Sequence, residues 1–143
     1  MLSNTMVDQL PDLSEEEREA LHSVELGLEW LRRAHGDLVG VHHKTGHAMD
    51  HFERAEAQLR ASDYDGLADA LRCEYLPRGA IDDRWTYDLL ESFEEGFLSD
   101  LAGFEERARE EVADGRRHVA ERHQEREWRE RAQEDGDGTD RRR

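Results

Sequence analysis

The chain is poor in cysteine and in long hydrophobic runs, and each shortage excludes a class of protein. Cys73 is the only cysteine among 143 residues, so no disulfide can form within the chain and a disulfide-stabilised scaffold is excluded. No stretch approaches the roughly 18 consecutive apolar residues that a membrane-spanning helix needs. Residues 1–11 have neither the basic start nor the apolar centre of a signal peptide. We therefore expect a cytoplasmic protein with no membrane partner.

Lysine is almost absent, although the chain is highly charged. Asp and Glu number 36 against 20 Lys and Arg, the net charge is −16, and Lys44 is the only lysine. This composition resembles that of cytosolic proteins from extreme halophiles, in which dense carboxylates retain water. At about 1 M salt the Debye length is only about 3 Å, so their mutual repulsion is screened. The composition predicts adaptation to a high-salt cytoplasm; an ordinary acidic helical protein is the alternative.

A heptad pattern dominates the first half of the chain. Ser14 and Glu17 have the spacing of a capping box, which predicts a helix start at Ser14. Hydrophobic and histidine positions then alternate in steps of three and four without a slip, which is typical of helices packed in a bundle. We define these positions as the seam: Leu21, Val24, Leu28, Leu31, His35, Leu38, His42, Thr45, Met49, Phe52, Glu56 and Leu59. The unbroken phase favours one helix from Ser14 to Ala61, while the glycines favour a break at His35–Gly36.

Two further helices are predicted in the second half. Ser62 and Asp63 are placed to cap a short helix over residues 63–75, and Asp82 or Asp83 to cap a longer one that ends near residue 114. We expect a flexible lead-in over residues 1–13, a helical core domain over 14–114, a charged helical extension over 115–133 and a disordered tail over 134–143. No strand-like alternation occurs, so the predicted fold class is all-α.

The expected architecture is an antiparallel hairpin of two long helices with a short connecting helix. Its main core should contain Leu28, Leu31, Leu38, Met49, Phe52, Phe93, Phe97, Leu101 and Phe104. The apolar stripes are wider than a two-helix seam, because Leu26, Val39, Val41, Leu89 and Leu98 lie outside the strict positions. A second copy of the chain could cover the remainder. We therefore expect a homodimer that completes a four-helix bundle.

Five of the eight histidines fall between residues 35 and 51. His43, His47 and His51 are each one helical turn apart, a spacing that can chelate a transition metal, and Asp50 could add a carboxylate. His35 and His42 occupy the seam and should face the interior, where acids of a neighbouring helix could join them in a metal or haem site. The competing interpretation makes the first three solvated and the seam pair satisfied polar residues.

No motif of a known catalytic class is present, so we expect a protein that is not an enzyme and has no cofactor beyond a transition metal. The charge of −17 over residues 1–114 opposes nucleic-acid binding. Trp128 stands on an otherwise charged helix and is the predicted anchor for a protein partner. The sequence thus predicts a non-enzymatic, self-associating helical interaction or structural protein. The alternative is a metal- or haem-binding helical bundle that uses the His35–His51 histidines.

Overall fold

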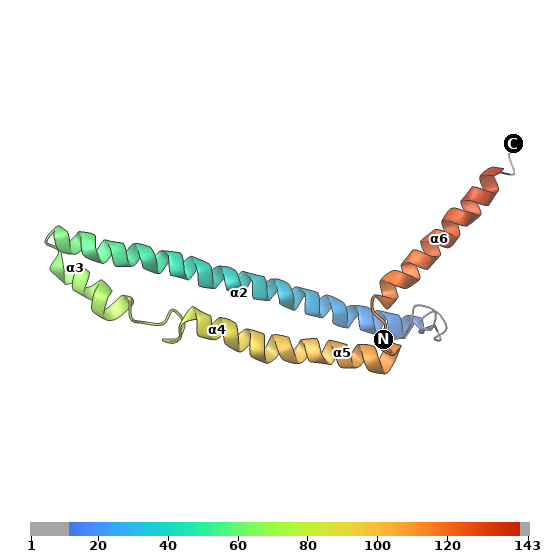
Figure 1. Ribbon diagram of the computed structural model, residues 1–143, viewed down its shortest axis with the longest axis horizontal. Helices are drawn as coiled ribbons and strands as arrows, with labels where there is room; N and C mark the ends of the chain where they lie inside the picture. The colour runs from blue at the N-terminus through green and yellow to red at the C-terminus, as the bar shows by residue number, and fades with distance from the viewer. Residues whose placement is uncertain (1–11, 141–143) are drawn as a thin grey trace. The chain divides into compact units, whose positions relative to one another are not determined.

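The computed structural model describes residues 12–140, and within that range the protein is all-α without a sheet (Figure 1). The chain divides into two compact units. The first unit comprises the residues up to Glu29 together with those from Leu101 onward, and the second unit comprises Trp30–Asp100. The expected core of residues 14–114 is therefore shared between two units. No helix of the described chain is long and apolar enough to cross a membrane.

Helix α2, Glu15–Ala61, confirms the long continuous helix in its 47 residues. Its start is the predicted capping box: the Ser14 amide donates to Glu17 Oε1 at 2.9 Å, and the Glu17 amide donates to Ser14 Oγ at 3.1 Å. The hydrogen bonds from the Ser14 amide and hydroxyl favour the ionised carboxylate and lower the pKa of Glu17.

The glycines of α2 do not break the helix, and they do not serve close packing either. A Cβ added at Gly27, Gly36, Gly40 or Gly46 would meet no atom within 4 Å. The suggestion of a break at Gly36 is wrong because the helix passes through it. Each glycine costs about 1 kcal/mol relative to alanine, a cost that the unbroken seam packing offsets.

The prediction that Asp63 caps the short second helix is wrong, because Asp63 ends α2 instead. It has φ of 66°, its amide donates to the Arg60 carbonyl at 3.2 Å, and the Tyr64 amide donates to the Leu59 carbonyl at 2.9 Å. These two bonds form a Schellman motif, in which the residue after the helix is left-handed. Asp63 tolerates that conformation better than most residues. Aspartate usually caps the N-terminus of a helix, but here it terminates the C-terminal end of α2.

The second unit continues with α3, Asp65–Ala70, and a π-helical turn η1, Leu71–Tyr75. Helix α4, Thr86–Phe93, runs into a second π-helical turn η2, Glu94–Leu98. Neither Asp82 nor Asp83 caps α4: both have positive φ in a tight turn closed by paired hydrogen bonds between Ile81 and Arg84. The N-cap position is Trp85, which makes no side-chain cap.

Within the second unit, α4 and η2 run antiparallel to α2. His35 pairs with Glu94, whereas His42, one heptad later on α2, pairs with Thr86. Residue numbers in the partner segment therefore decrease as those of α2 increase. Figure 1 shows the two segments side by side. The antiparallel arrangement agrees with the predicted hairpin.

The first unit is held by the small core of Leu21, Ala113 and Val119, against which Leu13, Ala108 and Val112 pack. Helix α5, Ser99–Ala113, stops before Asp114 and Gly115, which both have positive φ, but the packing continues beyond them because Val119 lies in the small core. Helix α6, Val119–Asp140, continues to residue 140, although a disordered tail was expected from 134. Closely spaced Glu–Arg pairs such as Glu125–Arg129, at 2.8 Å, support α6 despite its few apolar residues.

The predicted core is only partly buried. Leu28 is 7 % exposed, and Leu31, Leu38, Met49, Phe93 and Leu101 are half-buried. The expectation is wrong for Phe52, Phe97 and Phe104, which are 49 %, 59 % and 50 % exposed. Each long helix has its apolar neighbours on one side only, so side chains at the edge of the seam remain in solvent.

Candidate functional site

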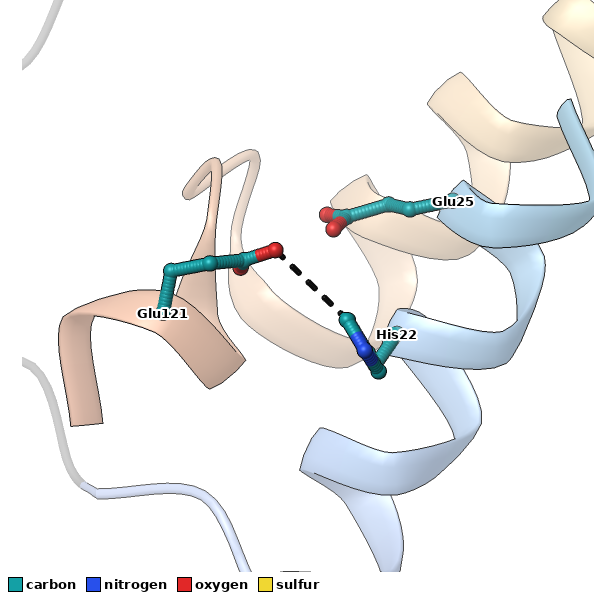
Figure 2. Close-up of side chains that lie close together, drawn as sticks. All are labelled: His22, Glu25 and Glu121. Atoms are coloured by element: carbon teal, nitrogen blue, oxygen red, sulfur yellow. Dashed lines mark ion pairs between the residues drawn. The ribbon is translucent and has the colours of Figure 1, made fainter. Parts of the chain in front are cut away.

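Three side chains capable of binding a metal converge in the first unit: His22, Glu25 and Glu121 (Figure 2). His22 and Glu25 stand three residues apart on α2, so they share one face of the helix. Glu121 lies in the first turn of α6. The small core brings the three side chains together. Leu21, which precedes His22 on α2, packs there against Val119, which lies two residues before Glu121 on α6.

One ligand atom from each of the three side chains lies within 4.8 Å of the other two. His22 Nδ1 is 3.6 Å from Glu121 Oε1, which is too long for a normal hydrogen bond. This nitrogen is buried and makes no hydrogen bond in the structure, although the His22 side chain as a whole is 41 % exposed. A buried ring nitrogen thus lies near two carboxylates without a hydrogen bond to either.

The electrostatic environment of Glu25 is unfavourable to its charge. Burial raises the pKa of Glu25, and the negative charges of Glu121 and Glu105 raise it further, against the opposing effects of His118 and His22. A positive charge placed between the carboxylates would remove this repulsion. The arrangement is therefore chemically suited to a cation that accepts one nitrogen and two oxygens.

Sequence reasoning missed this group. The His22–Glu25 spacing is visible in the sequence, but Glu121 is almost a hundred positions away and only packing brings it near. The structure leaves the predicted metal ligands His43, His47, Asp50 and His51 all exposed on α2. In the described part of the chain, His22, Glu25 and Glu121 form the only group of three potential ligands close enough together to hold one metal ion. A metal site at the surface histidines stays a prediction that nothing here tests.

The seam histidines are half-buried, as expected of residues that face a helix neighbour. His35 Nε2 donates to Glu94 Oε1 at 2.7 Å, and its ring stacks on Phe93 with centroids 6.0 Å apart and planes 7° from parallel. His42 Nδ1 lies 2.8 Å from the hydroxyl of the buried Thr86. These contacts favour satisfied polar residues over metal ligands.

A groove of about 670 Å³ opens beside His42 in the second unit, lined chiefly by apolar and aromatic side chains that include Met49, Phe52, Tyr75 and Trp85. The group of potential metal ligands found among the described residues does not lie in it. Trp128, the predicted partner anchor, is 57 % exposed on α6. Comparison of the chain with protein-family models, with curated proteins and with solved structures found no match.

Proposed function

We propose that this chain is a non-enzymatic helical interaction protein that self-associates along α2. The observation that carries the proposal is the uncovered apolar surface. In the described chain no large side chain is fully buried, whereas thirteen large hydrophobic side chains are exposed, Trp30 and Phe52 among them. Where exposed apolar side chains adjoin one another, the patch marks an interaction site in a folded protein.

The uncovered residues of α2 form a second stripe beside the seam. Ala34, Val41, Ala48 and Ala55 recur every seven residues, and the first three are exposed. Trp30 and Phe52 lie on the same line at 65 % and 49 % exposure, eleven residues to either side of Val41. We call Trp30, Ala34, Val41, Ala48 and Ala55, together with the exposed seam residue Phe52 at the adjoining edge, the α2 stripe.

The direction of the α2 stripe favours a second copy of the chain. At about 100° of rotation per residue, the stripe lies roughly 80° around α2 from the centre of the seam. A helix in a four-helix bundle has two neighbours separated by about a right angle. Within the second unit, α4 and η2 pack against the seam and form one of these two neighbours. The α2 stripe therefore faces the position of the second neighbour. Three apolar rows per heptad, where a simple seam has two, are typical of a bundle helix.

The partner role of α6 is a separate part of the proposal. Trp128 is exposed among charged residues, where burying an indole ring against a partner would be favourable. Charge pairs such as Arg122–Glu125 and Arg129–Glu125 occupy the surface near it, at 3.3 and 2.8 Å. The helix thus offers a single apolar anchor with a polar rim, which is the usual composition of a small docking surface.

Light scattering coupled to gel filtration in 2 M KCl tests self-association. The wild-type chain should have twice its mass of 16.7 kDa. The double variant Trp30→Glu and Val41→Glu should be a folded monomer, because it places charge on the α2 stripe. The matched control Ala57→Glu and Gln58→Glu adds the same charge at exposed positions of α2 outside the stripe and should keep the dimer mass.

Two results would contradict the proposal: a wild-type chain that is monomeric at tens of micromolar, or a stripe variant that keeps the wild-type mass. Circular dichroism of all three proteins shows whether helix content is preserved. A stripe variant that loses mass and helix together is replaced by the single change Val41→Glu.

A further inference from the structure

The unpaired nitrogen of His22 faces a space that fits a metal ion better than it fits a hydrogen bond. In a tetrahedral zinc site the bond lengths of about 2.0–2.2 Å place neighbouring ligand atoms about 3.4 Å apart. The distance of 3.6 Å between His22 Nδ1 and Glu121 Oε1 is close to that value. Glu25 completes the group within 4.8 Å, so small side-chain rotations bring three ligands to one centre.

We propose that His22, Glu25 and Glu121 bind a divalent transition-metal ion of the zinc type, which fastens the first turn of α6 to α2. The ion would satisfy the buried His22 nitrogen and place two positive charges between two carboxylates. The unsatisfied nitrogen and the neighbouring carboxylates thus have the same remedy.

The ligand set selects the class of metal. Imidazole nitrogen suits zinc, iron, nickel and copper, whereas magnesium and calcium take oxygen ligands. Three protein ligands leave a fourth tetrahedral position for water. The half-exposed side chains of His22 and Glu121, at 41 % and 50 %, leave the site accessible to that water and to the entering ion.

The consequence of binding is a fixed attachment of α6. Without metal, the contacts that tie α6 to its unit include the packing of Val119 in the small core, the long His22–Glu121 pair at 3.6 Å, and the pair between Arg126 and Asp12 at 3.2 Å, on exposed side chains. An exposed pair of this kind contributes at most about 1 kcal/mol. A metal ion joining Glu121 to His22 and Glu25 would hold the helix that carries Trp128. The site does not depend on self-association.

Calorimetric titration of the metal-stripped full chain with zinc chloride tests the site. The titration is done in 2 M KCl, because screening suppresses diffuse attraction of zinc to the 36 acidic residues. We expect one ion per chain. Loss of a metal ligand should weaken zinc binding by at least about tenfold, since even outer partners of ligands cost 10–100-fold. His22→Gln, Glu25→Gln and Glu121→Gln should each show this loss.

Two controls match the variants. Glu125→Gln removes a carboxylate one turn further along α6, and His47→Gln removes the central histidine of the exposed group on α2; both should bind zinc as the wild type does. Glu25→Gln keeps the test independent of folding, because it removes a charge that burial disfavours and should leave the metal-free fold intact. As a second measurement, zinc should slow hydrogen exchange in the first turn of α6.

The results separate the outcomes cleanly. A wild-type chain that binds no stoichiometric zinc overturns the proposal, and so does binding that survives His22→Gln. Binding that is lost in His47→Gln but kept in Glu121→Gln also overturns it and assigns the metal to the surface histidines. None of these results bears on the α2 stripe, whose test is the mass of the chain.

Discussion

Replacing Leu21 with alanine should test the small core that unites the first unit. Leu21 is 4 % exposed and packs with Ala113 and Val119. The substitution removes three carbons, worth about 0.8 kcal/mol each in transfer from water, or about 2.4 kcal/mol. The cavity left behind adds to this loss, and leucine-to-alanine changes in cores cost 2–5 kcal/mol. We expect the free energy of unfolding to fall by about 3 kcal/mol.

Leu26→Ala is the matched control, because it makes the same chemical change five residues further along α2. Leu26 is 40 % exposed, so about 1.5 kcal/mol of transfer free energy is at stake and no closed cavity forms. The free energy of unfolding of both variants is measured with denaturant in 2 M KCl and followed by circular dichroism. In a thermal scan, the melting temperature of Leu21→Ala should fall by roughly 10 °C. Equal losses in the two variants would refute the assignment of Leu21 to a buried core.

Four further predictions concern salt, the end of α2 and its start. The melting temperature should rise between about 0.1 and 2 M KCl, because screening removes carboxylate repulsion, and a flat response would contradict halophilic adaptation. Asp63→Gly should stabilise the fold by about 0.5 kcal/mol in denaturant unfolding, because glycine adopts the φ of 66° without strain; a loss of stability would refute the Schellman assignment. Ser14→Ala should cost about 1 kcal/mol through the lost cap. The pKa of Glu17 is lowered from 4.5, so the stability that its carboxylate contributes is present above pH 4.5 and is lost as the pH falls through the folded pKa. Glu17→Gln should therefore make the melting temperature depend less on pH below 4.5.

The two glutamates with shifted pKa values act in opposite directions on stability. Glu17 stabilises the folded chain in its ionised form, whereas the raised pKa of Glu25 contributes stability that is complete below pH 4.5 and lost as the pH rises through the folded value. The contribution of Glu25 is therefore lost as its carboxylate ionises beside Glu121. A metal ion bound between the two carboxylates would offset that loss.

The sequence by itself determined α2 and both of its ends. The seam recurs in steps of three and four, and the capping box needs only Ser14 and Glu17, so both are local patterns that any reader of the sequence can find. The end of α5 before Asp114–Gly115 is likewise marked locally, because a glycine with positive φ follows the last helical turn. The half-buried position of His35 and His42 followed from their place in the seam.

Only the tertiary structure decided which acidic residues end helices, which aromatic residues remain in solvent, and where metal ligands gather. Asp63 could cap or terminate a helix by type, and its φ of 66° settles the choice. Phe97 continues the apolar rhythm of its helix, yet it is 59 % exposed because the packed neighbour lies on another side. Glu121 joins His22 and Glu25 through the burial of Val119 against Leu21. Contacts between residues a hundred positions apart depend on how helices dock, and helical periodicity fixes the faces of a helix without fixing their partners.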